Sequence, residues 1–152
     1  MKTKVILSVI FFLIFLSSIS VGVFNHYQQN HFSCRAKVYL TRGKANYFTL
    51  LKFTFDGGKG HFSSISEYRD ESNYFPRINI NFNFKYLRKD DTVLMVSSDS
   101  TLEADKIKFL RPLIADFFIY PNRGYEVNIV KSSDNTYTFL EGDLPAYVCV
   151  IE

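Results

Sequence analysis

Side chains that could carry catalysis are scarce in this sequence. Its 152 residues include three histidines, two cysteines and no tryptophan. His26 and His31 lie just after an N-terminal apolar run, and His61 follows a glycine-rich turn, so no histidine belongs to a nucleophile–base motif. We therefore expect no enzymatic activity, no catalytic residue and no cofactor.

Metal-binding and phosphate-binding motifs are also missing. Cys34 and Cys149 form no CxxC pair and have no histidine at ligand spacing. The glycines at 57, 58 and 60 lack the spacing and the Gly-Lys-Ser/Thr ending of a P-loop, so a hairpin turn is the better interpretation. The acidic residues of the turns lack the spacing of a calcium loop: Asp90, Asp91, Asp99 and Asp105. We expect no metal site.

The chain carries little net charge. It has 18 Lys and Arg against 15 Asp and Glu, a formal charge of +3. Lys2 and Lys4 precede the apolar run and every carboxylate follows it, so the remainder is close to neutral. A nucleic-acid-binding domain of this size would carry a basic patch, and we predict no direct contact with nucleic acid. The content of 17% aromatic residues argues against disorder.

One long apolar run is present, from Val5 to Phe24, and it contains no charge. As a helix this segment would be about 30 Å long, enough to cross a bilayer. Lys2 and Lys4 favour a cytoplasmic N-terminus, which places the rest of the chain outside the cytoplasm. We divide the chain into an anchor (1–24), a juxtamembrane linker (25–33) and an exported domain (34–152). The alternative is a signal peptide cleaved after Ser20, but the apolar character continues beyond that residue.

The two cysteines, Cys34 and Cys149, bracket the exported domain almost end to end. An even number of cysteines in an oxidising compartment favours a disulfide. We therefore predict a structural bridge that joins the first exported strand to the last.

Alternation of apolar and polar residues predicts a mainly β domain. The pattern is strictest in Arg77–Lys85 and continues at Tyr86, which indicates a strand with one buried face. A helix capped by Ser100 or Thr101 and ending near Leu110 interrupts the strands, and residues 117–120 finish a second turn or pack under the sheet. About eight strands with turns between them predict an antiparallel sandwich or barrel. The other strands are expected at 35–41, 46–56, 61–68, 92–97, 125–131, 136–141 and 146–151.

The two faces of the strictly alternating strand have different candidate roles. Asn79, Asn81 and Asn83 face either solvent, an interface or a polar cavity. The opposite face is either ordinary core or, if a barrel encloses a cavity, the lining of an apolar ligand site. Its members are Ile78, Ile80, Phe82, Phe84 and Tyr86.

Short motifs at both ends of the exported domain support a family resemblance. They are the Lys-flanked anchor, Ser33-Cys34-Arg35-Ala36, the glycine-punctuated aromatic strands and the closing Leu144-Pro145-Ala146-Tyr147-Val148-Cys149. With these features the chain resembles the FidL-like family of small enterobacterial inner-membrane proteins. Such proteins look like the partner halves of ToxR/ToxS-like and VtrA/VtrC-like regulator pairs.

The resemblance implies a single-pass inner-membrane protein with its C-terminal domain in the periplasm. It also implies a lipocalin-like β-barrel that forms a heterodimer with a membrane-bound winged-helix transcriptional regulator and sometimes binds an apolar ligand such as a bile salt. We expect an accessory that modulates such a regulator. The alternative is an exported structural or fimbria-related β protein, for which the cysteine spacing is too wide and an uncleaved anchor would be an obstacle.

Overall fold

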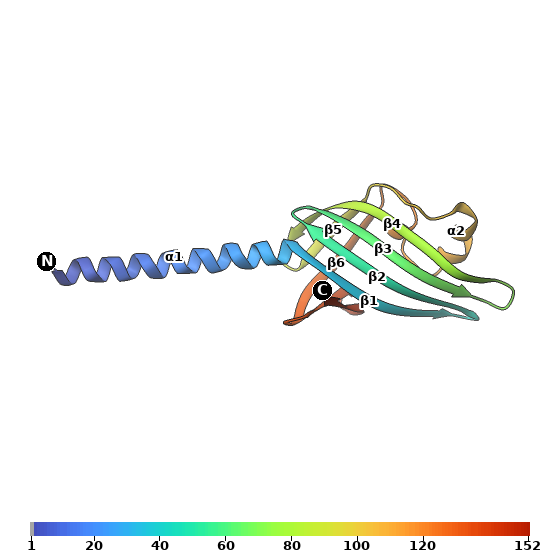
Figure 1. Ribbon diagram of the computed structural model, residues 1–152, viewed down its shortest axis with the longest axis horizontal. Coiled ribbons are helices and arrows are strands. Elements are labelled where there is room, and N and C mark those ends of the chain that lie inside the picture. The colour runs from blue at the N-terminus through green and yellow to red at the C-terminus, as the bar shows by residue number, and fades with distance from the viewer. Residues whose placement is uncertain (1) are drawn as a thin grey trace.

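A helix followed by an eight-stranded sheet makes up the structure, a computed structural model that describes residues 2–152 (Figure 1). Helix α1 (Lys2–Asn30) precedes the sheet, and α2 (Ala104–Leu110) and the 3₁₀ helix η1 (Asp116–Phe118) lie between β5 and β6. Neighbouring strands pair antiparallel and β8 returns to β1, so the predicted mainly β fold is confirmed and is a closed barrel rather than a sandwich. The strands are β1 (His31–Arg42), β2 (Ala45–Asp56), β3 (Lys59–Arg69), β4 (Tyr74–Lys89), β5 (Thr92–Ser97), β6 (Gly124–Ser133), β7 (Thr136–Glu141) and β8 (Leu144–Ile151).

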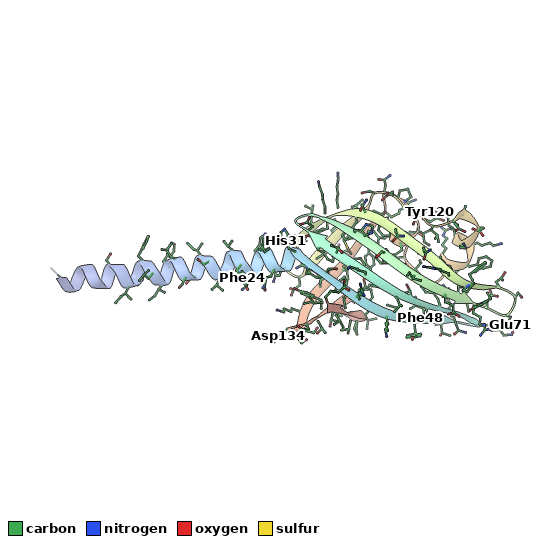
Figure 2. The ribbon with its side chains drawn as sticks, viewed as in Figure 1. Phe24, His31, Phe48, Glu71, Tyr120 and Asp134 are labelled. Atoms are coloured by element: carbon green, nitrogen blue, oxygen red, sulfur yellow. A yellow bond between two sulfur atoms is a disulfide. The ribbon has the colours of Figure 1, made fainter. Side chains whose placement is uncertain are left out.

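Helix α1 projects away from the barrel, and its side chains from Ile10 to Gln29 are exposed (Figure 2). Its segment Ile10–Asn30 has a mean hydropathy of 1.7. This segment is long and apolar enough to cross a membrane. The hydroxyls of Ser17 and Ser20 donate to main-chain carbonyls of the preceding turn, at 2.7 and 2.9 Å. These bonds satisfy the serines within the helix, as an apolar environment requires. The helix is compatible with a single membrane anchor.

Helix α1 runs straight into the barrel. Residues 25–33, predicted to form a linker, contain no glycine or proline, so nothing interrupts the helix before Asn30, and β1 begins at the next residue. The last carbonyls of the helix have partners in the barrel, because Arg88 Nη1 donates to the Gln29 oxygen at 2.7 Å and Gly57 N donates to the Asn30 oxygen at 3.0 Å. We call the end of the barrel that joins α1 the proximal end. The opposite end, at the β3–β4 turn, is the distal end.

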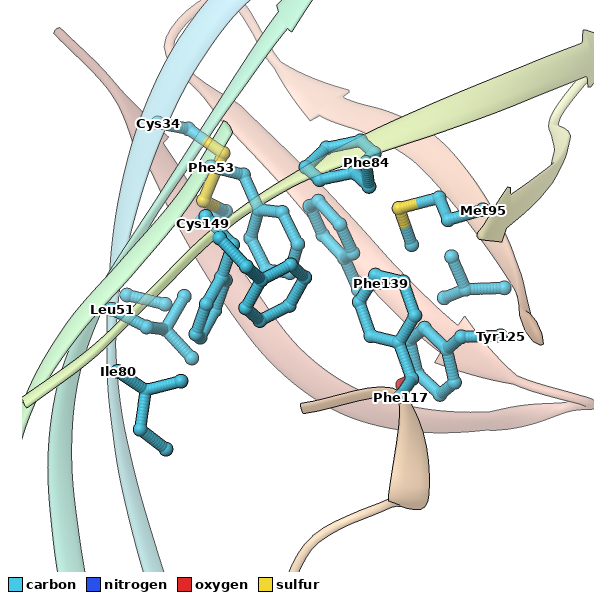
Figure 3. Close-up of a cluster of buried hydrophobic side chains, with 14 of the residues drawn as sticks. Cys34, Leu51, Phe53, Ile80, Phe84, Met95, Phe117, Tyr125, Phe139 and Cys149 are labelled. Atoms are coloured by element: carbon cyan, nitrogen blue, oxygen red, sulfur yellow. A yellow bond between two sulfur atoms is a disulfide. The ribbon is translucent and has the colours of Figure 1, made fainter. Parts of the chain in front are cut away.

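Aromatic side chains fill the interior (Figure 3). The Phe53 ring lies 4.9 Å from that of Phe62 and 5.3 Å from that of Phe139, measured between centroids. The Phe84 ring occupies the place where Gly60 would carry a side chain: an added Cβ would lie 2.2 Å from Phe84 Cζ. Glycine at this position of β3 therefore makes room for an aromatic ring in β4.

The strands of the barrel differ in length, and its closure is correspondingly uneven. Strands β1 and β2 pair along their whole length, from His31↔Asp56 to Arg42↔Ala45. Between β1 and β8, by contrast, the described residues pair only at Cys34↔Ile151 and Arg35↔Val150. Residues 36–42 of β1 thus extend beyond their pairing with β8. We call the whole junction between β1 and β8, with its paired and unpaired parts, the β1–β8 seam.

The predicted disulfide is confirmed, and it crosses this seam. Cys34 and Cys149 are bonded with their Cα atoms 5.4 Å apart, and both residues are fully buried. Phe53 lies beside the bridge (Figure 3). A covalent bond therefore reinforces the strand pair that has the fewest paired residues in the described barrel.

The β5–β6 crossover covers the barrel interior on the side of β4. The predicted cap of its helix is wrong: α2 starts at Ala104, after Glu103, with no side-chain capping bond. The Thr101 hydroxyl instead accepts a hydrogen bond from Asn81 N at 2.8 Å, and Asp99 accepts one from Asn83 N at 3.0 Å. Thr101 and Asp99 thus satisfy main-chain N–H groups in the part of β4 that does not pair with β5. A hydroxyl used in this way is not available to cap the helix.

Candidate functional site

A cavity of about 470 Å³ lies among inward-facing side chains of the distal half of the barrel. Its walls come from strands far apart in the ladder and from the crossover before η1. Pro112, Glu141 and Ala146 also border it and are exposed, so the cavity opens to solvent. Its apolar walls include Val38, Leu40, Leu51, Phe62, Ile80 and Leu113.

Two buried hydroxyl groups of this cavity have no hydrogen-bond partner among the described residues. They are Ser64 Oγ on β3 and Tyr147 Oη on β8, and both residues line the cavity. Ser64 is only 5% exposed. Burial raises the pKa of the Tyr147 hydroxyl well above its usual value, so this group stays protonated and can donate a hydrogen bond. An unpartnered buried hydroxyl costs roughly 1–3 kcal/mol, a penalty that a bound polar atom would relieve.

Other hydroxyls in the same region are satisfied, which makes the two exceptions specific. Tyr47 Oη and Ser66 Oγ lie 2.8 Å apart, and Ser66 Oγ donates to Thr49 Oγ1 at 2.8 Å. Tyr47 and Thr49 line the cavity, yet their polar atoms are engaged with each other through Ser66. Of the hydroxyls of Tyr47, Thr49, Ser64 and Tyr147, those of Ser64 and Tyr147 are therefore the ones free to bind a ligand.

At the rim, Tyr125 Oη donates a hydrogen bond to Glu141 Oε1. Tyr125 is the second residue of β6 and Glu141 is the last residue of β7, so the bond joins two strand ends beside the opening. Burial, and then the bond to the Glu141 carboxylate, raise the pKa of Tyr125. Tyr125 therefore stays neutral, and the charge at the rim is that of Glu141.

The crossover segment 111–119 forms one wall of the cavity and is anchored on both sides. Leu110, Phe117 and Ile119 are buried in the interior, and the Phe117 ring lies 5.1 Å from that of Phe82. Between these anchors, residues 112–115 border the cavity. Arg42 at the end of β1 donates to the Pro112 carbonyl, which ties this wall to the strand opposite. Both alternatives predicted for residues 117–120 occur: the turn η1 ends at Phe118, and Phe117 and Ile119 are buried.

The cavity adjoins the β1–β8 seam. Val38 and Leu40 reach it from β1, and Ala146 and Tyr147 reach it from β8. These residues lie on either side of the part of the seam where the two strands are not paired. A change in strand pairing at the seam would therefore move the cavity wall.

The five predicted core or cavity residues all point inward and are at most 4% exposed. Of these, Ile80 lines the cavity. Phe82 packs against Phe62 in the aromatic core, to which Phe84 also belongs (Figure 3). Tyr86 Oη donates to the Asn30 oxygen at 3.0 Å. The fifth, Ile78, is packed in the core.

The asparagine row lies on the outer face of the barrel. Asn79, Asn81 and Asn83 are exposed, which separates them from the interior cavity. Asn83 Oδ1 lies 2.9 Å from His61 Nδ1, so this histidine has an ordinary surface partner. Asn79 and Asn81 border a groove on the outer face instead.

The sequence pattern does not predict which hydroxyl groups line the cavity without a hydrogen-bond partner. Ser64 alternates with apolar neighbours as a core residue does, and nothing in the pattern indicates that its hydroxyl lacks a partner while that of Ser66 has two. Tyr147 belongs to the motif Leu144–Cys149, but its burial depends on contacts from β2 and β7, such as stacking on Phe139 with 4.7 Å between the ring centroids. Among the side chains that the structure describes, no cluster of His, Cys, Asp and Glu is placed to hold a metal ion.

Comparison with known protein families gives a match. The model of the YqeJ C-terminal domain matches residues 29–149, from the last turn of α1 to the second cysteine of the disulfide. No curated protein matches the chain.

Proposed function

The chain belongs to the YqeJ C-terminal domain family, and from this premise we propose that it is a membrane-anchored accessory protein that modulates a membrane-bound transcriptional regulator. In this proposal the barrel binds an amphipathic ligand in its distal cavity and pairs with the exported domain of the regulator. The likeness to FidL-like proteins, the partner halves of ToxR/ToxS-like and VtrA/VtrC-like pairs, supports a winged-helix regulator as the partner.

The observation that carries the proposal is the pair of unpartnered hydroxyls in an otherwise apolar cavity. A volume of about 470 Å³ falls in the range of small-molecule sites. The walls favour an apolar body, and Ser64 Oγ and Tyr147 Oη favour a ligand with oxygen atoms on that body. A bile salt, with an apolar steroid face and several hydroxyls, has this chemistry.

The unpaired part of β1 supports pairing with another protein. A strand edge with free main-chain groups is a template for an added strand, and residues 36–42 of β1 extend beyond their pairing with β8. Because the cavity lining includes residues from both sides of this seam, a ligand in the cavity would have different affinities for the paired and unpaired states. A ligand changes an equilibrium only through such a difference.

The anchor supports an inner-membrane location with the barrel in the periplasm. Lys2 and Lys4 precede the apolar helix, which favours a cytoplasmic N-terminus. The buried disulfide fits an oxidising compartment. In this arrangement the chain influences transcription through its partner.

The test is co-purification of the full-length chain with the exported domain of the regulator encoded next to its gene, with and without taurodeoxycholate. We expect a stable complex whose affinity changes with the bile salt. A monodisperse chain that ignores this domain in both conditions would contradict the pairing. Isothermal titration of taurodeoxycholate into the chain alone, below its micellar concentration, tests the cavity separately.

A further inference from the structure

A second surface feature lies on the outside of the barrel, away from the cavity. It is a groove of about 1100 Å³ that extends over the outer faces of β8, β1, β2, β3 and β4. Strand pairing sets its floor, because Lys37 pairs with Leu50, Leu50 with Ile65, and Ile65 with Asn79. These four residues therefore form a continuous row across four strands. We call this feature the outer groove.

The outer groove combines exposed apolar side chains with one sign of charge. Leu50 and Ile65 are 43% and 50% exposed, and Val148 and Val150 are 52% and 51% exposed. The charged residues that border the groove are all cationic: Arg35, Lys37, Lys52 and Arg77. Apolar surface with cations at its margins is complementary to a segment that alternates apolar and acidic side chains.

One carboxylate of the chain, that of Glu152, already binds to cations of the outer groove. Glu152 forms ion pairs with Arg35 Nε through one carboxylate oxygen and with Lys52 Nζ through the other. The bond from Lys52 lowers the pKa of Glu152. One carboxylate thus engages two of the four cations, whereas Lys37 and Arg77 have no ion pair within the described residues.

We propose that the outer groove binds an extended acidic–apolar segment of another protein, with its apolar side chains on Leu50 and Ile65 and its carboxylates on Lys37 and Arg77. Glu152 occupies the groove's other cations and competes with such a segment. The exposed amides of Asn79 and Asn81, at the margin, can donate to and accept from its main chain. This interaction does not depend on the cavity, because the side chains that carry it, on Lys37, Leu50, Ile65 and Arg77, are exposed on the outer face and do not line the cavity.

The experiment measures binding of a fluorescein-labelled peptide of about twelve residues that alternates Glu and Val to the full chain in phosphatidylcholine nanodiscs. A peptide that alternates Lys and Val is the charge control. We expect binding of the acidic peptide alone, weakened by salt as a screened charge interaction is. The K37E/R77E variant should bind at least about tenfold more weakly, and E152Q should bind more tightly because Arg35 and Lys52 become available.

The matched control is K89E/K131E, which reverses two exposed lysines outside the groove and should leave peptide affinity unchanged. Equal binding of both peptides, or of the acidic peptide to wild type and K37E/R77E, would overturn the proposal. So would binding of phosphatidylglycerol vesicles in place of the peptide. Titration of taurodeoxycholate into the same variants separates this outcome from failure of the cavity, since groove substitutions leave the cavity lining intact.

Discussion

Tyr86 Oη donates a hydrogen bond to the main-chain oxygen of Asn30 at 3.0 Å, which joins the end of β4 to the last residue of α1. Asn30 is 9% exposed, so this contact is buried where helix and barrel meet. The same oxygen also accepts from Gly57 N, and Arg88 holds the neighbouring carbonyl of Gln29. The barrel thus holds the end of the helix through two side chains of β4 and one main-chain N–H of the β2–β3 turn.

Removal of the Tyr86 hydroxyl tests this junction. We expect Y86F to lower the free energy of unfolding by about 1 kcal/mol, since one buried hydrogen bond is lost while the ring packing remains. Because the chain has no tryptophan, near-ultraviolet circular dichroism of tyrosine in detergent reports the unfolding. The control is Y39F, at a side chain that is 74% exposed, which should have almost no effect. Equal stabilities for Y86F and Y39F would contradict a structural role for this bond.

The disulfide is expected to stabilise the barrel strongly. Cys34 and Cys149 are 115 positions apart, and in the chain-entropy model a loop of that size contributes about 4–5 kcal/mol. The double variant C34A/C149A should lose a large part of this, measured by urea unfolding. Hydrogen exchange should rise first in residues 36–42 and in β8, at the seam. Uniform loss of protection over all strands would show that the bridge does not act locally.

Gly60 provides a test of the close approach between β3 and β4. A Cβ at this position would lie 2.2 Å from Phe84 Cζ and 2.7 Å from the Thr54 main-chain oxygen, and the latter cannot move away easily. We expect G60A to destabilise the barrel by roughly 1–3 kcal/mol through overpacking. The matched control is G22A, where a Cβ meets nothing within 4 Å, and its unfolding midpoint should match that of wild type or exceed it.

Asp70 makes the fold sensitive to acid at the β3–β4 turn. The pKa of its carboxyl falls from 3.8 to about 2, first through the Ser72 N–H at 2.8 Å and then through the Tyr68 hydroxyl. Since the folded value lies below the unfolded one, the carboxylate stabilises the fold above pH of about 4. That contribution is lost as the pH falls towards about 2.

D70N should therefore flatten the pH dependence of the unfolding midpoint in this acid range. D143N, in the β7–β8 turn, is the control and should retain the wild-type slope. An unchanged slope in D70N would show that other carboxylates account for acid unfolding.

The cavity hydroxyls predict opposite effects on stability and on binding. Without ligand, S64A and Y147F remove unpartnered buried groups, so the free energy of unfolding should stay constant or rise by about 1 kcal/mol. The same variants should bind taurodeoxycholate more weakly. S66A is the matched control: it breaks the bonds to Tyr47 and Thr49 and should lower stability. Destabilisation by S64A equal to that by S66A would mean that Ser64 has a structural partner.

The sequence predicted the parts of this fold that depend on local periodicity. Strict alternation at 77–85 placed β4, whose inward residues are buried as expected, and the position of the two cysteines gave the disulfide. Strand bounds were less accurate: β4 extends from Tyr74 to Lys89, because its ends are held by contacts with β3, β5 and α1 rather than by its own pattern.

The cavity could not be predicted in the same way. It exists because β1–β4 are longer than the strands opposite them and because residues 112–115 bridge the resulting space, and neither relationship is encoded in any one segment. The start of α2 was mispredicted for a similar reason. The Thr101 hydroxyl accepts a hydrogen bond from the main chain of Asn81 in β4, 20 positions away, instead of capping the helix. Long-range pairing decides what each hydroxyl does.

The direct passage from Asn30 to His31 fixes the rotational phase of the barrel about the helix axis. Each residue of an α-helix turns the chain by about 100° and advances it by about 1.5 Å. The face of the barrel that meets a neighbouring protein is therefore set by the number of helical residues between the bilayer and β1. One alanine inserted before Gln29 would point the seam and the outer groove in a new direction, although every contact within the barrel would stay the same.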